Sequence, residues 1–473
     1  MKLNKSLTIF LLCHFIVWSV LPLLRPNLPM DSSEALVWGF IGEWGTNKHP
    51  PLSGFLADLM YNLSGGHPAS LYFLSQLFVV GGLFYIYKLG RLFLSEEKAL
   101  IAACVMEAVA YYSLVTPEYN VNIIALLLWP TAAYYFYLAI NKNALSDWIL
   151  FGLFAGLNML NKYVSGVLLL CLGLYLVTTK AGRASLKSWK LYVGAAIALA
   201  VVLPHLIWLH WHDYYVIDYF LGRSGEGKTL PYGLAHVFYP LKFLGSQILT
   251  SALALVILFS GRYYSPKQQV GVAASDRQFI FYAGILPILV MASISLALGI
   301  KLKSMWGSPV LYMLGISFFT WLPFDTQKSF KPLLKACYGA MAVFAVAFVL
   351  QVGLTKSPKF NLDAADFAAK TGGERYAYVG GSVWLASTIG VYAGNHPQVL
   401  FFMSSETNPW IDMADVKNKG ILVVDEDLNS YHNYQKTFAN LSEPEVYLLQ
   451  VKNILGQTKE YPLYYGIIAG EQR

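Results

Sequence analysis

Long apolar runs are the feature that most limits what this chain can fold into. A helix needs about 18 or more apolar residues to cross a bilayer, and about eleven runs approach or exceed that length. They lie near 7–24, 69–90, 99–115, 121–140, 148–160, 163–179, 191–209, 244–260, 278–298, 306–323 and 332–352. Only 13% of the residues are charged, whereas soluble domains are about a quarter charged. The sequence therefore predicts a polytopic α-helical membrane protein with about eleven or more spans.

The first run indicates a retained membrane anchor with a cytoplasmic N-terminus. Lys2 and Lys5 precede it, but no small-residue cleavage site follows. In this orientation the short inner loops carry the expected excess of basic residues. One of them contains no acidic residue and four basic ones: Lys180, Arg183, Lys187 and Lys190. Most carboxylates, histidines and tryptophans outside the spans then lie on the outer side. We therefore expect the functional site on that side of the membrane.

The chain changes character at about Ser357, where it becomes more polar. Strand-like runs alternate there with helix-like ones. The strand-like runs are RYAYVGG, QVLFF, GILVVDEDL, EVYLLQV and LYYGIIAG. This alternation favours a small α/β domain. We therefore expect a transmembrane domain at 1–354 and a periplasmic α/β domain at 355–473. The second domain has no phosphate loop or nucleotide fingerprint.

The net charge and the cysteine positions argue against nucleic-acid binding and against cysteine-based sites. The net charge of +7 reflects cytoplasmic loops, so no nucleic-acid binding is expected. The four cysteines lie in apolar runs without short spacing, which predicts neither a disulfide nor a thiolate metal site. They are Cys13, Cys104, Cys171 and Cys337.

The loop from Asp31 to Leu52 follows the first run and is unusually polar and aromatic. It contains Asp31, Glu34, Glu43 and His49 and ends in two prolines. Its first half also fits an interfacial amphipathic helix, since apolar residues recur there every four positions. We expect Asp31 to be functional and the other two carboxylates to be solvated on that helix. A second interfacial helix fits residues 52–63.

Other outer-side residues are weaker candidates. Glu118 lies in a TPEYN turn, where it serves either a site or the dipole of the following helix. Lys162 lies between two apolar runs, as a snorkelling lysine or as a phosphate ligand. Further outer cations are Arg223, Lys301 and Lys303.

A histidine-rich stretch, HLIWLHWHDYY, follows on the outer side. It contains His205, His210, His212 and Asp213 but lacks the spacing of common metal motifs. The sequence leaves open whether a divalent cation binds. No other cofactor is expected.

Several motifs, taken in order, resemble a known family. Asp31, Trp38, Gly45 and the HPP sequence at His49 are spaced as in the bacterial branch of the family-39, protein O-mannosyltransferase-like glycosyltransferases of the GT-C fold. That branch includes lipid A aminoarabinose and galactosamine transferases. Further similar motifs are TPEYNVN, GLNMLNKY, PHLIWLHWHDYYVIDYF and KSMWGSPVLY. The resemblance covers roughly residues 7–325. It departs at Ser32, where the family has a second acid, and at Glu118, where Asp is commoner.

The resemblance implies an inverting transfer of a sugar from a polyprenyl-phosphate donor at the periplasmic side of the bacterial inner membrane. The phosphate leaves readily, so cations and one base suffice. Asp31 would be the base, and Glu118 would orient the acceptor or the base, or hold a metal ion. The implied phosphate ligands are Lys162, His49, Lys301, Lys303 and Arg223. The acceptor would be lipid A or another glycolipid.

Three alternative functions remain open. One uses a different acceptor, and the other two belong to different classes of protein. A protein O-glycosyltransferase would use the same chemistry on another acceptor. A transporter of lipid-linked sugars should show repeated halves and helices broken near the midplane, and no repeat is present. A structural membrane subunit would leave the Asp31-to-His49 spacing unexplained.

Overall fold

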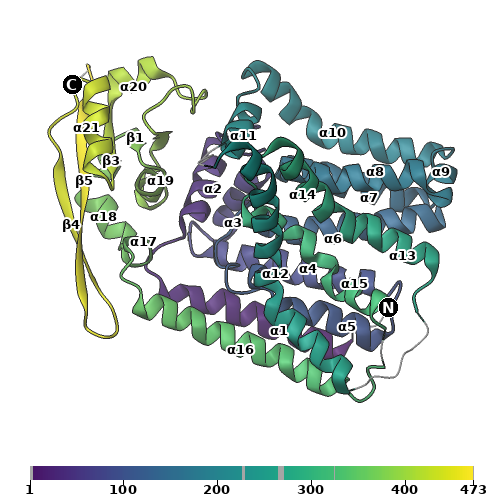
Figure 1. Cartoon of the computed structure of the whole chain (residues 1–473). Coiled ribbons are helices and arrows are strands. Elements are labelled where there is room, and N and C mark those ends of the chain that lie inside the picture. Colours follow the sequence, from purple (N-terminus) through teal and green to yellow (C-terminus); the bar gives the residue numbers. More distant parts are fainter. Residues whose placement is uncertain (1–3, 226–229, 265–270, 324, 472–473) are drawn as a thin grey trace.

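The chain is a polytopic helical membrane protein with a C-terminal sheet domain (Figure 1). The computed structural model describes residues 4–225, 230–264, 271–323 and 325–471. Within these residues, seven helical segments are long and apolar enough to cross a membrane. They are α1 (Lys5–Val20) with the turn after it, α4 (Ser70–Gly90), α6 (Val121–Lys142), α10 (Trp189–Trp211), α12 (Tyr232–Tyr264), α13 (Ala274–Ile280) joined to α14 (Leu286–Leu298), and α16 (Phe330–Leu354). Each coincides with an expected span.

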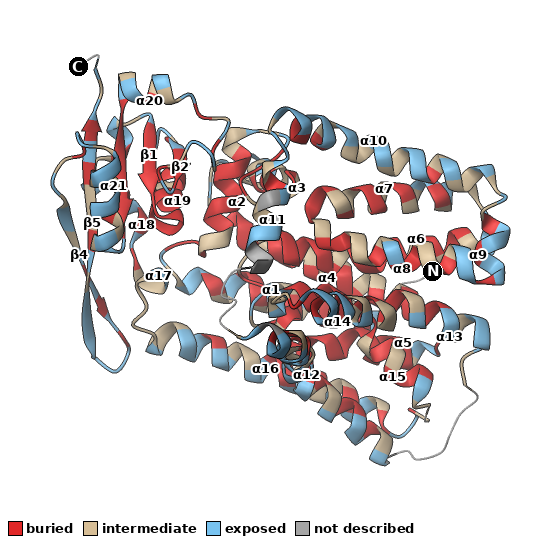
Figure 2. Cartoon of the chain, turned by 45° about the horizontal axis from the view of Figure 1, so that its top comes forward, coloured by how far each residue is buried: buried red, intermediate tan, exposed pale blue. Residues whose placement is uncertain are grey.

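Burial separates inner helices from outer ones. α4 and α6 are largely buried, whereas α10, α12 and α16 have long exposed faces (Figure 2). On α16 the exposed residues Val343, Val346, Leu350 and Leu354 recur every three or four positions. Such an apolar stripe suits contact with lipid, which needs no hydrogen bonds.

The expected count of eleven spans is not confirmed. Runs 148–160 and 163–179 form the shorter helices α7 (Leu145–Asn161) and α8 (Gly166–Thr178). Runs 99–115 and 306–323 combine short helices, α5 (Glu96–Cys104) and α15 (Leu314–Trp321), with tight 3-10 turns. Irregular backbone is tolerated there because it is buried in protein.

Glu107 lies in the first of these irregular segments and is fully buried. Its carboxylate accepts a hydrogen bond from Trp18 Nε1 at 2.9 Å and contacts His14 Nδ1. His14 Nε2 lies 3.2 Å from Gln76 Oε1, while the Gln76 amide nitrogen donates to the carbonyl of Thr116. The His14 ring therefore lies between the Glu107 carboxylate and the Gln76 side-chain oxygen. This intramembrane acid is thus paired inside the protein.

The C-terminal sheet has the order β2-β1-β3-β5-β4. The strands are β1 (Tyr378–Gly381), β2 (Gln398–Phe401), β3 (Gly420–Asp425), β4 (Glu445–Lys452) and β5 (Thr458–Ala469). The first three pair in parallel, and β5 joins β3 and β4 in antiparallel fashion. The helices are α17 (Pro358–Asn361), α18 (Ala364–Lys370), α19 (Val383–Tyr392), α20 (Met413–Lys419) and α21 (Leu428–Thr437). Each strand expected from the sequence is present.

The loop after α1 forms two helices, α2 (Met30–Ile41) and α3 (Leu52–Leu63). Gly39 and Gly54 let them cross closely, since a Cβ on Gly39 would lie 2.5 Å from the Gly54 carbonyl oxygen. A solvated polar face on α2 is a wrong expectation, because every residue from Ser32 to Gly39 is buried. α19 packs against α2 and covers it (Figure 1).

The C-terminal domain also holds the segment that leads into α2. Three hydrogen bonds join them: Arg25 Nη2 to the Lys359 carbonyl (3.1 Å), Asn27 Nδ2 to the Leu362 carbonyl (2.8 Å) and Leu28 N to the Tyr392 hydroxyl (3.0 Å). From the other side, the Tyr72 hydroxyl of α4 donates to the Asn27 carbonyl at 3.0 Å. The chain entering α2 is therefore fixed by both parts of the protein.

Candidate active site

A cavity of about 250 Å³ opens beside the N-terminal half of α2. Its wall combines α2, the loop after α2, the start of α6, the turn between α7 and α8, and the turn at Ser304–Gly307. It is lined by Met30, Asp31, Glu34, Ala35, Trp38, Lys48, His49, Asn120, Val121, Asn122, Lys162, Tyr163, Tyr219, Lys303, Met305 and Trp306. Four residues singled out from the sequence thus meet in one cavity: Asp31, His49, Lys162 and Lys303.

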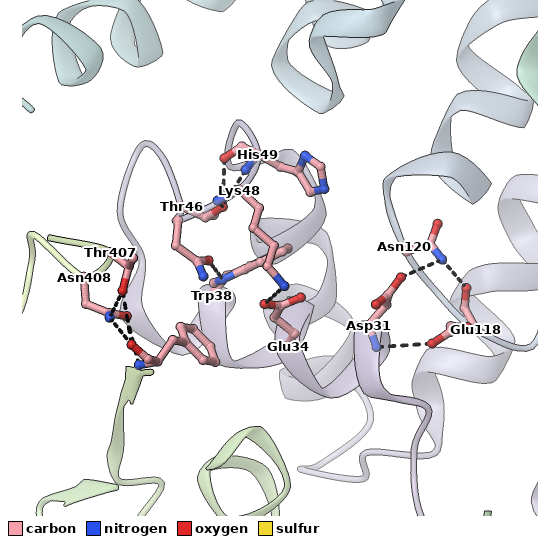
Figure 3. A network of polar contacts seen from close by, with 12 residues as sticks. Asp31, Glu34, Trp38, Thr46, Lys48, His49, Glu118, Asn120, Thr407 and Asn408 are labelled. Atoms are coloured by element: carbon pink, nitrogen blue, oxygen red, sulfur yellow. Dashed lines mark hydrogen bonds and ion pairs between the residues drawn. The ribbon is translucent and has the colours of Figure 1, made fainter. Parts of the chain in front are cut away.

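Asp31 lies in the first turn of α2, where the helix dipole favours a carboxylate. Glu118 lies behind it, and its Oε1 accepts a hydrogen bond from the Asp31 backbone nitrogen at 3.3 Å (Figure 3). Asn120 contacts Asp31 Oδ2 at 3.5 Å and donates to the Glu118 carbonyl at 3.1 Å. Burial and the nearby charge of Asp31 raise the pKa of Glu118 to about 7. Glu118 does not line the cavity, so its contact with Asp31 is from behind.

Lys162 is the most deeply buried of the cavity cations, at 6% exposure. Its Nζ donates to Asn122 Oδ1 at 2.6 Å and lies 5.8 Å from the centre of the Trp306 ring. Burial lowers the pKa of Lys162 to about 7, and Asp31 partly offsets that effect. A buried cation across a cavity from a carboxylate suits an anionic ligand.

Glu34 and Lys48 form an ion pair in the cavity wall that sequence reasoning missed. Lys48 Nζ lies 2.6 Å from Glu34 Oε1, and their side chains are 16% and 3% exposed (Figure 3). Burial opposes the charge on Lys48, but Glu34 outweighs it, so the pKa of Lys48 is raised. The expectation that Glu34 is solvated is therefore wrong. Lys48, which precedes the HPP motif, is the sequence feature that could have indicated this ion pair.

The loop between α2 and α3 is shaped by its own side chains. Thr46 Oγ1 accepts hydrogen bonds from the backbone nitrogens of Lys48 (3.1 Å) and His49 (2.9 Å). Trp38 Nε1 donates to Asn47 Oδ1 at 2.8 Å, and the Trp38 ring meets His49 edge-on. These contacts turn Lys48 and His49 toward the cavity (Figure 3).

Gly45 and Glu43 attach this loop to α10. A Cβ on Gly45 would lie 2.2 Å from the Trp208 ring, so only glycine fits under that ring. Glu43 Oε2 accepts a hydrogen bond from Trp208 Nε1 at 2.8 Å. Glu43 is therefore a partly buried structural contact, rather than the solvated residue expected.

Two of the expected phosphate ligands, Lys301 and Arg223, are not among the described residues that line this cavity. Lys301 does not line it, although Lys303, two residues on, does. Arg223 belongs to α11 (Tyr215–Gly225), but its side chain lies outside the described part of the structure.

The histidines after α10's proline have structural partners. His205 is buried, with Nδ1 2.6 Å from the Trp44 carbonyl and Nε2 2.7 Å from the Tyr163 hydroxyl. His212 Nδ1 contacts the Trp208 carbonyl at 2.7 Å. Within the described ranges, no group of three or more His, Cys, Asp or Glu residues is arranged to hold a metal ion.

The fold of this chain is shared with a protein of known structure. The chain is similar to the crystal structure of ArnT from Cupriavidus metallidurans bound to undecaprenyl phosphate, with a TM-score of 0.66, 12% identity and 98% coverage of both chains. Its apo form gives a TM-score of 0.63. A family model described as dolichyl-phosphate-mannose-protein mannosyltransferase matches residues 48–208. The chain therefore has the GT-C fold.

The chain is also similar to two curated bacterial proteins that are named as lipopolysaccharide core galacturonosyltransferases. Lipopolysaccharide core galacturonosyltransferase RgtB of Rhizobium johnstonii is 23% identical over 308 residues, which span 62% of this chain and 60% of that protein. RgtA of the same organism is 20% identical over 386 residues, or 77% and 75% of the two chains. The resemblance expected from the motifs is confirmed.

Proposed function

We propose that this protein transfers a sugar from a polyprenyl-phosphate donor to a glycolipid, lipid A or the lipopolysaccharide core. The observation that carries the proposal is one cavity with Asp31 on one wall and Lys162, Lys303 and His49 on others. The solved ArnT binds undecaprenyl phosphate, and both relatives are named for transfer to the lipopolysaccharide core. These names support the donor and the acceptor class.

The reaction follows from the charges in the cavity. Asp31 takes the proton of the acceptor hydroxyl as that oxygen attacks the anomeric carbon. The bond between this carbon and the phosphate oxygen breaks, and polyprenyl phosphate leaves with the bonding electrons. Lys162, Lys303 and His49 stabilise the negative charge that develops on the phosphate. Attack opposite the leaving group inverts the anomeric configuration. Glu118 orients Asp31 from behind.

We place the site outside the cytoplasm, in the bacterial inner membrane. Basic loops support this orientation, as does the cluster of polar residues at one end of the helices. Residues 1–354 would then be the catalytic membrane domain and 355–473 a periplasmic domain, consistent with α16 ending at Leu354.

The test is transfer by purified Asp31→Asn protein with a lipid-linked sugar and lipopolysaccharide. We expect a loss of about 10²–10⁴-fold with unchanged thermal stability. Glu43→Gln, in the loop after α2 and outside the cavity lining, is the matched control and should keep its activity, because glutamine retains an oxygen that can accept the Trp208 N–H. Undiminished turnover by the Asp31 variant would refute the assignment of the base.

A protein acceptor is the second candidate, supported by the name of the matching family model. Mass spectrometry of lipid A, core and envelope glycoproteins from cells with and without the gene separates the two. Loss of a sugar from the lipopolysaccharide supports a glycolipid acceptor, and loss from a glycoprotein supports the alternative.

A further inference from the structure

The turn of the β4–β5 hairpin is apolar and exposed, although it belongs to the more polar part of the chain. The strands pair as far as Lys452 with Thr458, so the turn spans 453–457. Within it, Ile454 is 68% exposed and Leu455 is 67% exposed. Two adjacent large apolar side chains at a hairpin tip are unfavourable in water and suggest contact with an apolar phase.

The turn is attached to the end of a membrane-spanning helix. Ile454 N donates to the Gly353 carbonyl at 2.9 Å, and Asn453 Nδ2 donates to the Leu354 carbonyl at 3.2 Å. The Ile454 side chain lies over Gly353, where an added Cβ would be 3.2 Å from it. Because α16 ends at Leu354, the turn lies beside the C-terminal end of this long apolar helix (Figure 1).

The flanking residues match a membrane surface. Ile454 packs over Gly353, beside the end of the exposed apolar stripe of α16, and Leu455 follows it in the turn. Lys452 and Lys459, on either side of the turn, are both exposed. Apolar side chains with lysines beside them suit the boundary between acyl chains and headgroups, since the ammonium groups stay at the polar level.

We propose that the 453–457 turn inserts into the bilayer surface beside α16, with Ile454 and Leu455 among the acyl chains and Lys452 and Lys459 at anionic headgroups. Lipid is the occupant because the turn lies beside the end of a lipid-facing stripe and is bonded to the end of the same helix. The C-terminal sheet would thereby be held at the membrane at a second point, independent of its packing on α2. This membrane contact is separate from the transfer reaction.

A fluorescent label at the turn tests this contact. The full chain, with its native cysteines replaced by alanine and its thermal stability checked, receives Leu455→Cys carrying an environment-sensitive dye. In bilayers of phosphatidylethanolamine and phosphatidylglycerol, we expect blue-shifted emission and quenching by nitroxide-labelled acyl chains. A label at Asn429, exposed on α21, should show neither effect. Emission at 455 like that in water, or a blue shift without quenching by lipid, would overturn the proposal.

A substitution pair gives an independent check. With the dye at Thr458, beside the turn, the double change Ile454→Asp and Leu455→Asp should shift emission toward that in water and reduce quenching severalfold. Val446→Asp is the matched control. Val446 is also exposed, at 52%, but it lies at the end of β4 that is far from the turn. Equal emission in the two variants would contradict insertion of the turn.

Discussion

Glu118 contacts Asp31 through the backbone: its carboxylate accepts the Asp31 N–H at 3.3 Å, behind the cavity wall. Burial, and then the charge of Asp31, raise the pKa of Glu118 to about 7. Two carboxylates this close resist being ionised together. The protonation of Glu118 therefore sets the charge next to the proposed base.

Glu118→Gln should remove a pH-dependent loss of stability. The ordinary pKa of this carboxyl is 4.5, so the unfolded chain releases its proton before the folded chain does. The free energy of unfolding then falls as pH rises from about 4.5 to about 7, and it stays lower above that range. Unfolding temperatures in detergent should decline over this range in the wild type and change less in the variant. Parallel curves for the two proteins would contradict the raised pKa.

Lys162→Met should weaken binding of polyprenyl phosphate by about ten- to a hundredfold. A hydrogen bond from a charged group contributes about 1.5–3 kcal/mol, and this variant loses that donor. Because burial lowers the pKa of Lys162 to about 7, the wild-type protein loses this cation as pH rises through neutrality. Its affinity should therefore fall more steeply with pH than that of the variant. Lys301→Met, outside the cavity lining, is the control variant. An equal loss of affinity for polyprenyl phosphate in both variants would argue against a special role for Lys162.

Lys48→Met alone should destabilise the protein by about 3 kcal/mol, because the buried Glu34 carboxylate loses its cation. The double variant Glu34→Gln, Lys48→Met should recover much of that loss, since neither charge remains. Thermal unfolding of the wild type, both single variants and the double variant gives the coupling energy. Additive effects would mean that the pair is not coupled.

Tyr392→Phe removes the hydroxyl that accepts the Leu28 N–H. An unsatisfied buried donor costs about 1–3 kcal/mol, and the entry to α2 loses one of its three attachments to the C-terminal domain. We expect a several-fold lower kcat with unchanged affinity for polyprenyl phosphate, since the proposed phosphate ligands lie elsewhere. Tyr434→Phe is the control, because that hydroxyl bonds Asp425 within the domain. A fall in kcat of equal size in the control would indicate a general effect.

Features that depend on local patterns were predictable. The seven long spans each follow from one apolar run, and the five strands from short apolar runs between turns. Asp31, His49 and Lys162 could be selected because few polar residues interrupt the spans on the outer side. The two broken runs, 99–115 and 306–323, were not distinguishable, because tertiary burial rather than composition permits their irregular backbone.

Burial by distant segments could not be predicted. Periodicity puts Glu34 on the polar face of a surface helix, but this residue lines the cavity together with residues far along the chain, such as Lys162 and Trp306. Lys48 lines the same cavity and forms the ion pair with Glu34 there. Similarly, nothing in the sequence distinguishes Lys301 from Lys303, because the direction of each side chain depends on the 3-10 turn that begins at Ser304.

The three hydrogen bonds between 25–28 and the C-terminal domain have a consequence for biosynthesis. The segment before Asp31 is synthesised before the long helices that follow it, whereas its partners at Lys359, Leu362 and Tyr392 are made after the seven long helices of the described residues. A nascent chain can therefore insert most of its helices while the approach to α2 lacks these attachments. The approach to α2 therefore gains these three attachments only after the long helices have been made.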